Sequence, residues 1–186
     1  MLRRVTDRLN RNYNRCMSWR FVLVSCCALL AFVPRSSAQD ISRAYCGKDG
    51  KAHLVYRDDS VKTLRSEPKQ VGCQDIVVTA DGRTVGWSVL VENCCTSYPI
   101  PTSIVVYSGN RRTIISVGQM VWEWRFIDAG KRVAVLSGPV HGEAAEANLY
   151  DAHSGKTVAT WGGEGTAPDW AADWKQQFAK AEQNIP

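Results

Sequence analysis

The chain has 186 residues, 45% hydrophobic and 22% charged, with a formal net charge of +5. The positive charge resides in residues 1–38, which carry seven Lys or Arg and one Asp, so that the rest of the chain has 16 basic and 17 acidic residues. Net charge therefore gives no support for a nucleic-acid or anionic-membrane partner. Residues 39–186 are long enough for one domain with a core of its own.

The first segment has the order of a secretory signal peptide. Basic residues ending at Arg20 precede the uncharged apolar run 21–33, and the small residues Ser36 and Ala38 follow it. As a helix the apolar run would span ~20 Å, which is too short for a hydrocarbon core of ~30 Å. We expect cleavage after residues 1–38, with the true start of translation at Met17, and a periplasmic or secreted protein without membrane contact afterwards.

Cysteine usage follows the same division. Three of the seven cysteines lie in the leader, which leaves Cys46, Cys73, Cys94 and Cys95. An even number of cysteines in an exported chain favours disulfides over a metal site. Because a bridge between the adjacent Cys94 and Cys95 would close a strained ring, we expect each of them to pair with Cys46 or Cys73.

Residues 39–163 are predicted to form a β domain built from hairpins. Each prediction rests on two runs of strand-forming residues on either side of turn residues such as Asp-Gly. The predicted hairpins span residues 53–64, 76–91, 103–117, 122–136 and 147–161.

The hairpins recur along the chain. Residues 80–87 align with residues 128–135 at an offset of 48, and the segment around Tyr107 aligns with that around Tyr150 at an offset of 43. The repeating unit is therefore four strands in ~45 residues. The opening hairpin around Tyr56 is similar to the second half of a further copy.

A unit of this kind resembles a β-propeller blade of the WD40, quinoprotein or TolB-like type. The resemblance covers residues ~52–162 and rests on the Asp-Gly or Ala-Gly turn before a strand and on the segment 149–158. The whole chain also resembles uncharacterised secreted bacterial proteins with blade-like repeats, a resemblance that implies no activity. A single-chain propeller needs about four to eight blades, and about two and a half are present. We expect an all-β fold of antiparallel blade-like sheets packed as a sandwich, the alternative being a partial propeller completed by several chains.

Residues 164–186 are predicted to form a linker and a C-terminal amphipathic helix. Pro168 suits a first helical turn, and Trp170, Trp174 and Phe178 recur every four residues to form one stripe. We expect the stripe to dock on the sheet. The alternative is a protruding helix that binds a partner protein.

Aromatic residues also alternate within one predicted strand. Trp122, Trp124 and Phe126 are expected to share one face and to pack in the core. The functional alternative is an aromatic platform for glycans, with Trp87 and Trp161 at its rim.

Two polar segments are candidate sites. His141, Glu143 and Glu146 form the richest cluster of metal-ligating residue types, but no cysteine follows Cys95, which excludes the zinc deaminases. A polar loop explains the cluster, and we expect neither a metal nor a cofactor. The second segment is the long loop 93–101, where functional residues of a rigid sheet are often found. Its candidate binding residues are Asn93, Thr96, Ser97 and Tyr98.

Together these features favour an exported, non-enzymatic binding or interaction module whose partner is an unknown protein or glycan of the cell envelope. One alternative is an envelope glycan or peptide hydrolase that uses His141, Glu143 and Glu146. Another is a subunit of an oligomeric propeller.

Overall fold

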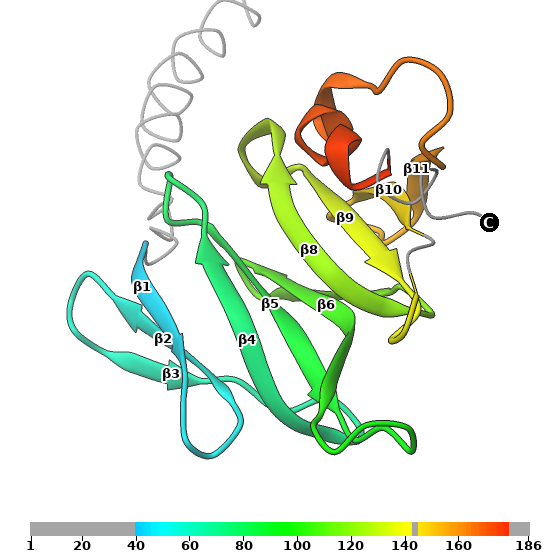
Figure 1. Cartoon of the computed structure of the whole chain (residues 1–186). Coiled ribbons are helices and arrows are strands. Elements are labelled where there is room, and N and C mark those ends of the chain that lie inside the picture. Colours follow the sequence, from blue (N-terminus) through cyan, green and yellow to red (C-terminus); the bar gives the residue numbers. More distant parts are fainter. Residues whose placement is uncertain (1–39, 143–144, 179–186) are drawn as a thin grey trace, which may run out of the picture. The chain divides into compact units, whose positions relative to one another are not determined.

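The computed structural model describes residues 40–142 and 145–178. Within them, eleven strands form three antiparallel sheets, none of which closes on itself (Figure 1). The first sheet contains β1 (Ile41–Cys46), β2 (Ala52–Tyr56) and β3 (Val61–Thr63). The second contains β4 (Gln70–Val78), β5 (Thr84–Val91), β6 (Ile100–Ser108) and β7 (Arg111–Ser116). The third contains β8 (Met120–Ile127), β9 (Arg132–Gly138), β10 (Glu146–Asp151) and β11 (Thr157–Trp161).

All five predicted hairpins are present, so the antiparallel β prediction is confirmed. The two four-stranded sheets correspond to the two repeating units found in the sequence. Strand β1 was not predicted, because polar and apolar residues do not alternate regularly in its sequence. The burial of its side chains is irregular as well. Strand β4 begins six residues before its predicted start at Ile76, because its first part is polar and interrupted by register shifts.

The turn between β4 and β5 shows why Asp-Gly marks these hairpins. The Asp81 carboxylate accepts hydrogen bonds from the Thr79 hydroxyl at 2.6 Å and from the Arg83 amide at 3.0 Å. Gly82 has a φ of +68°, and a Cβ there would lie 2.9 Å from the carbonyl oxygen of Ile41. Glycine is required here by both the backbone angle and the close approach of β1.

The sheets pack face to face in chain order. One apolar cluster lies between the first and second sheets and contains Leu54, Val85 and Trp87. A second cluster, which contains Ile104 and Val135, lies between the second and third sheets. The middle sheet is therefore buried on both faces, which explains why residues 84–89 of β5 and 104–107 of β6 are buried without alternation.

The three aromatic residues of β8 do not share a face, so that prediction is wrong. Trp124 and Phe126 pack toward the second sheet, whereas Trp122 packs on the opposite side. The register between β8 and β9 shifts between Val121 and Glu123. A shift of this kind adds one residue to the strand and reverses the side-chain direction on either side of it.

The C-terminal segment covers the outer face of the third sheet. Trp174 and Phe178 are buried against β9, β10 and β11, with Trp170 half-buried beside them, so docking of the stripe is confirmed. The first turn is a 3₁₀ helix, Asp169–Trp174, preceded by Pro168 in extended conformation rather than within a helical turn. Arg125 stacks on Trp174 at 4.5 Å and donates a hydrogen bond of 2.7 Å to Asp173.

The predicted end of this helix, beyond Phe178, lies outside the described residues, as do the predicted leader and its predicted cleavage site. Across residues 40–142 and 145–178, no helix has both the length and the apolar character needed to span a membrane.

Candidate functional site

The predicted binding loop projects from the end of the second sheet between β5 and β6. Ser97 and Tyr98 are exposed, while Asn93 and Thr96 are half-buried. The Thr96 hydroxyl donates a 2.6 Å hydrogen bond to the Tyr98 carbonyl, and the Asn93 amide lies 3.4 Å from the same hydroxyl. These contacts order the loop without assistance from a disulfide.

The expected pairing of the four remaining cysteines is wrong. Cys46, at the end of β1, is bonded to Cys73 in β4, while Cys94 and Cys95 are free and exposed. Strand β1 packs beside β4, which places the two Cα atoms 5.7 Å apart, well within the range that a disulfide spans. Because β1 was not predicted, this juxtaposition was not available from the sequence.

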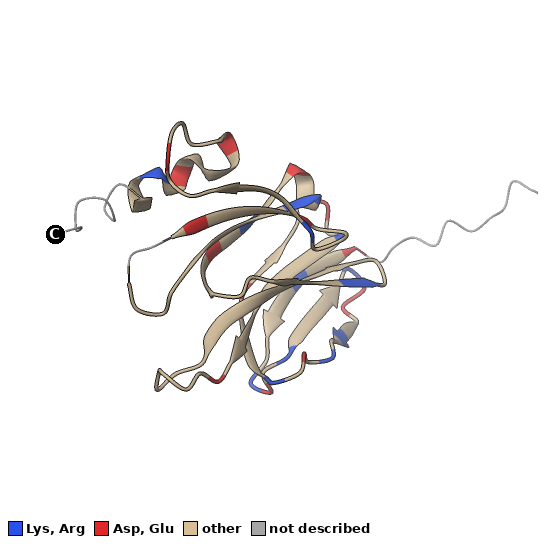
Figure 2. Ribbon diagram, turned by 90° about the vertical axis from the view of Figure 1, so that its right-hand side faces the viewer, with Lys and Arg blue, Asp and Glu red and all other residues tan. Residues whose placement is uncertain are grey.

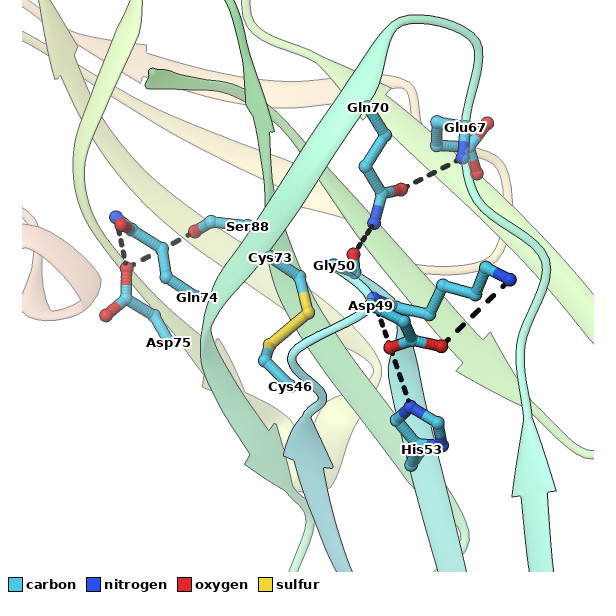
Figure 3. Close-up of a disulfide and its surroundings, with 11 residues drawn as sticks. Cys46, Asp49, Gly50, His53, Glu67, Gln70, Cys73, Gln74, Asp75 and Ser88 are labelled. Carbon is cyan, nitrogen blue, oxygen red and sulfur yellow. Dashed lines mark hydrogen bonds and ion pairs between the residues drawn. A yellow bond between two sulfur atoms is a disulfide. The ribbon is translucent and has the colours of Figure 1, made fainter. Parts of the chain in front are cut away.

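Polar contacts surround this disulfide (Figure 3). The Gln70 amide donates a 2.7 Å hydrogen bond to the Gly50 carbonyl and accepts one of 2.9 Å from the Glu67 amide. The Asp49 carboxylate accepts a hydrogen bond from the Lys51 amide and pairs with His53 at 3.0 Å. These two bonds lower the pKa of the Asp49 carboxyl, and the bond with His53 has the larger effect. The β1–β2 turn is thus fixed to β4 by covalent and polar contacts together.

The two free thiols lie very close together. The Sγ atoms of Cys94 and Cys95 are 2.9 Å apart, and Cys94 Sγ also lies 3.8 Å from the Asn93 amide oxygen. The hydrogen bond with Cys94, and then the negative charge of a Cys94 thiolate, raise the pKa of the Cys95 thiol.

The acidic cluster of the hydrolase alternative is not assembled by the described residues. His141 and Glu146 are exposed, and the Glu146 carboxylate accepts a 2.9 Å hydrogen bond from the Asn148 amide. Glu143 lies outside the described residues. In the described part of the chain, no three His, Cys, Asp or Glu side chains are grouped as metal ligands would be.

The alternative of an aromatic platform for glycans lacks the rim expected from Trp87 and Trp161. Trp87 is 1% exposed and Trp161 is 7% exposed, because both contribute to apolar clusters between layers. Rings buried on both sides cannot stack on a sugar.

Sequence reasoning missed a pocket at the opposite end of the second sheet from the cysteine loop. Turns of the second and third sheets meet there around an open cavity of about 450 Å³, which we call the turn-end pocket. Four of its lining residues are basic or imidazole side chains, namely Arg83, Arg111, Lys131 and His153. Its two acidic residues are Asp81 and Asp151. Figure 2 shows that charged residues concentrate at such turns and strand ends, while the strands are mostly uncharged.

The two carboxylates of the turn-end pocket are already occupied by local hydrogen bonds. The Asp151 carboxylate accepts 2.7 Å hydrogen bonds from both the hydroxyl and the amide of Ser154, and these bonds lower the pKa of Asp151. In the same way, hydrogen bonds from the Thr79 hydroxyl and the Arg83 amide lower the pKa of Asp81. In the described residues neither Arg83 nor Lys131 forms a salt bridge. The pocket therefore presents more positive charge to a ligand than its acidic residues neutralise.

Two hydrogen bonds tie the two sheets together across the pocket. The Arg111 guanidinium donates to His153 Nε2 at 2.7 Å, and the Thr113 hydroxyl donates to the His153 carbonyl at 3.0 Å. Because a guanidinium is only a donor, His153 Nε2 accepts this hydrogen bond. The remaining N–H groups of Arg111 stay available to a ligand.

A second, apolar hollow of about 330 Å³ adjoins the turn-end pocket and shares Ala129 and Gly130 with it. Val77, Trp124 and Phe126 contribute to its walls. A ligand that fills both hollows would place an apolar part beside its charged part.

One signal in the sequence could have indicated the pocket. Arg83 and Lys131 occupy equivalent positions in the aligned repeats 80–87 and 128–135, directly after the turn glycine. Equivalent turns of stacked repeats lie at the same end of the stack.

No family model matches the chain, and no curated protein is similar to it in sequence.

Proposed function

We propose that the protein is an exported binding module that holds a carboxylate-bearing glycan or peptide in the turn-end pocket. The observation that supports this proposal is the convergence of Arg83, Arg111 and Lys131 from three different turns on one cavity. A volume of about 450 Å³ is within the range of small-molecule pockets. Arginine and lysine are the side chains that recognise carboxylates by charge-assisted hydrogen bonds.

The architecture supports binding by a rigid surface. The pocket lining comes from short turns between strands whose faces are buried, so little conformational entropy is lost on binding. The adjoining apolar hollow would accept a sugar ring face or an apolar side chain next to the carboxylate.

Calorimetric titration of the full chain tests this function with two pairs of probes. An oligogalacturonate is compared with a neutral glucan of the same length, and an apolar peptide with a free C-terminal carboxylate is compared with its amidated form. We expect one carboxylate probe to bind and its neutral counterpart not to bind, and the probe that binds identifies the source of the carboxylate. Absence of binding by both carboxylate probes would contradict the proposal.

The variant pair Arg83→Gln/Lys131→Gln should weaken binding by at least about tenfold, since a hydrogen bond to a charged group contributes about 1.5–3 kcal/mol. Lys48→Gln is the matched control, because Lys48 is an exposed cation of the β1–β2 turn, which contacts the start of β4 rather than the turn between β4 and β5. Equal affinities of the two variants would show that the pocket is not the site.

We also propose that the stacked sheets act as an open array of blade-like units within one chain. The C-terminal segment covers the outer face of the third sheet, which supports this arrangement over a ring of several chains. Light scattering should give the molar mass of a single chain. The mass of a closed ring would favour the oligomeric propeller instead.

A further inference from the structure

The cysteine loop carries a chemistry that the proposed binding function does not use. Cys94 and Cys95 are adjacent, exposed and free, and their sulfur atoms are 2.9 Å apart. We propose that Cys94 and Cys95 form a thiol–disulfide exchange site that acts on disulfides of proteins or small molecules.

The distance between the two sulfurs favours rapid ring closure. To form a disulfide, the sulfurs need only approach from 2.9 Å to about 2.05 Å. The loop is already ordered by the hydrogen bond from Thr96 to the Tyr98 carbonyl. The dithiol state is therefore preorganised for its own oxidation.

The same adjacency makes the oxidised state easy to reduce. Neighbouring Cα atoms across a trans peptide are about 3.8 Å apart, which is below the usual range of about 4.4–6.8 Å for disulfides. A bond between neighbours is consequently strained, and strained bonds are more readily reduced. A pair that closes quickly and reopens easily has the properties of an exchange site rather than of a structural bond.

Either sulfur can take the first step, since either can donate the hydrogen bond that joins them. The attacking thiolate forms when one thiol releases its proton to water. Its sulfur bonds to one sulfur of the substrate disulfide, and the other substrate sulfur leaves as a thiolate that takes up a proton.

The neighbouring cysteine completes the exchange. Its thiol loses a proton, its sulfur bonds to the Sγ atom of the first cysteine, and the bond between that cysteine and the substrate breaks. The second substrate sulfur leaves as a thiolate and takes up a proton. The two cysteines are thereby oxidised to a disulfide, and the substrate disulfide is reduced to two thiols. The reverse sequence would oxidise a substrate dithiol.

The site is open to a macromolecular substrate. Tyr98 lies three residues after Cys95, is 55% exposed and offers an aromatic contact in the same loop as the sulfurs. The loop joins the ends of β5 and β6 that lie away from the turn-end pocket, so failure of either proposal leaves the other intact.

Treatment of the full chain with oxidised glutathione, followed by alkylation and trypsin digestion, tests the proposal. Trypsin places Cys94 and Cys95 together in peptide 84–111, while Cys46 and Cys73 fall in peptides 44–48 and 70–83. We expect peptide 84–111 to lose the mass of two hydrogen atoms and each chain to release two molecules of reduced glutathione. An unchanged peptide, a peptide that keeps two glutathione groups, or a disulfide-linked dimer of chains would overturn the proposal.

Two single variants test resolution by the second thiol. Cys95→Ser should retain one glutathione on Cys94, and Cys94→Ser should retain one on Cys95, because no second thiol resolves the mixed disulfide. Ser97→Ala is the matched control in the same loop and should behave like the wild-type protein. Release of the bound glutathione from either cysteine variant at the rate of the wild-type protein would refute resolution by the neighbouring thiol.

Discussion

The two cysteine pairs of this protein differ in almost every physical respect. Cys46 and Cys73 are separated by 27 residues and join two strands that pack side by side, whereas Cys94 and Cys95 are neighbours in an exposed loop. The disulfide of the first pair closes a long loop of the chain between two strands. A disulfide of the second pair would close only the small ring that contains the peptide bond between the two cysteines. Loop length and local packing, rather than residue type, therefore decide which pair contributes to stability.

The largest effect should follow from removal of the first pair. Cys46→Ser/Cys73→Ser should lower the free energy of unfolding by about 3–4 kcal/mol, because a loop of this length regains its conformational freedom in the unfolded state. Urea denaturation at neutral pH measures the change. A loss below about 1 kcal/mol would show that the packing of β1 beside β4 suffices without the bond.

A smaller loss is expected from the turn that leads away from this disulfide. Gly50 has a φ of +73°, and a Cβ there would lie 2.7 Å from the Val71 carbonyl oxygen. Gly50→Ala should therefore cost about 2–3 kcal/mol of stability from strain and steric overlap. Gly109→Ala is the control, since Gly109 has a similar φ of +61° but no atom within 4 Å of the added carbon. It should cost about 1 kcal/mol, and equal losses would exclude the steric contribution.

The acid side of the stability profile should depend on the same turn. Hydrogen bonds from His53 and the Lys51 amide lower the pKa of Asp49 in the folded state below its unfolded value of about 3.9. Their stabilisation is complete above the unfolded pKa and is lost as the pH falls through the folded pKa. Asp49→Asn should thus reduce the fall in Tm between neutral pH and pH values below about 4.

Asp59→Asn provides the comparison for that experiment, because Asp59 is an exposed carboxylate of the β2–β3 turn. It should leave the pH profile of Tm nearly unchanged. Parallel profiles of both variants would mean that the Asp49 contacts do not contribute to acid unfolding.

The smallest effect is expected from the exposed pair. Cys94→Ser/Cys95→Ser should change the free energy of unfolding by less than about 0.5 kcal/mol, as is usual for surface substitutions. The same urea denaturation, run under reducing and non-reducing conditions, measures it. A loss above about 1 kcal/mol would remove the contrast between the two pairs.

The hairpins were predictable because their signals are local. An Asp-Gly turn between two strand-forming runs specifies a hairpin whatever the rest of the chain does. The repeat likewise gave the four-stranded units, and the spacing of Trp174 and Phe178 gave the docking of the C-terminal segment.

The remaining features depend on contacts between distant segments. The partner of Cys73 is set by the packing of β1, and the direction of Trp122 is set by a register shift opposite β9. The turn-end pocket exists only because turns of two sheets meet, with Arg111 reaching His153 across 42 residues. No local pattern encodes such meetings, although the equivalent placement of Arg83 and Lys131 in the repeats was a usable hint.

The C-terminal segment has a further consequence for how the chain could grow. Stacked repeats form an extensible array, in which any exposed sheet face can receive another sheet. Trp174 and Phe178 occupy that face on the third sheet, with Arg125 stacked over the Trp174 ring. A further sheet could therefore stack on the third sheet only by displacing this segment and its aromatic contacts.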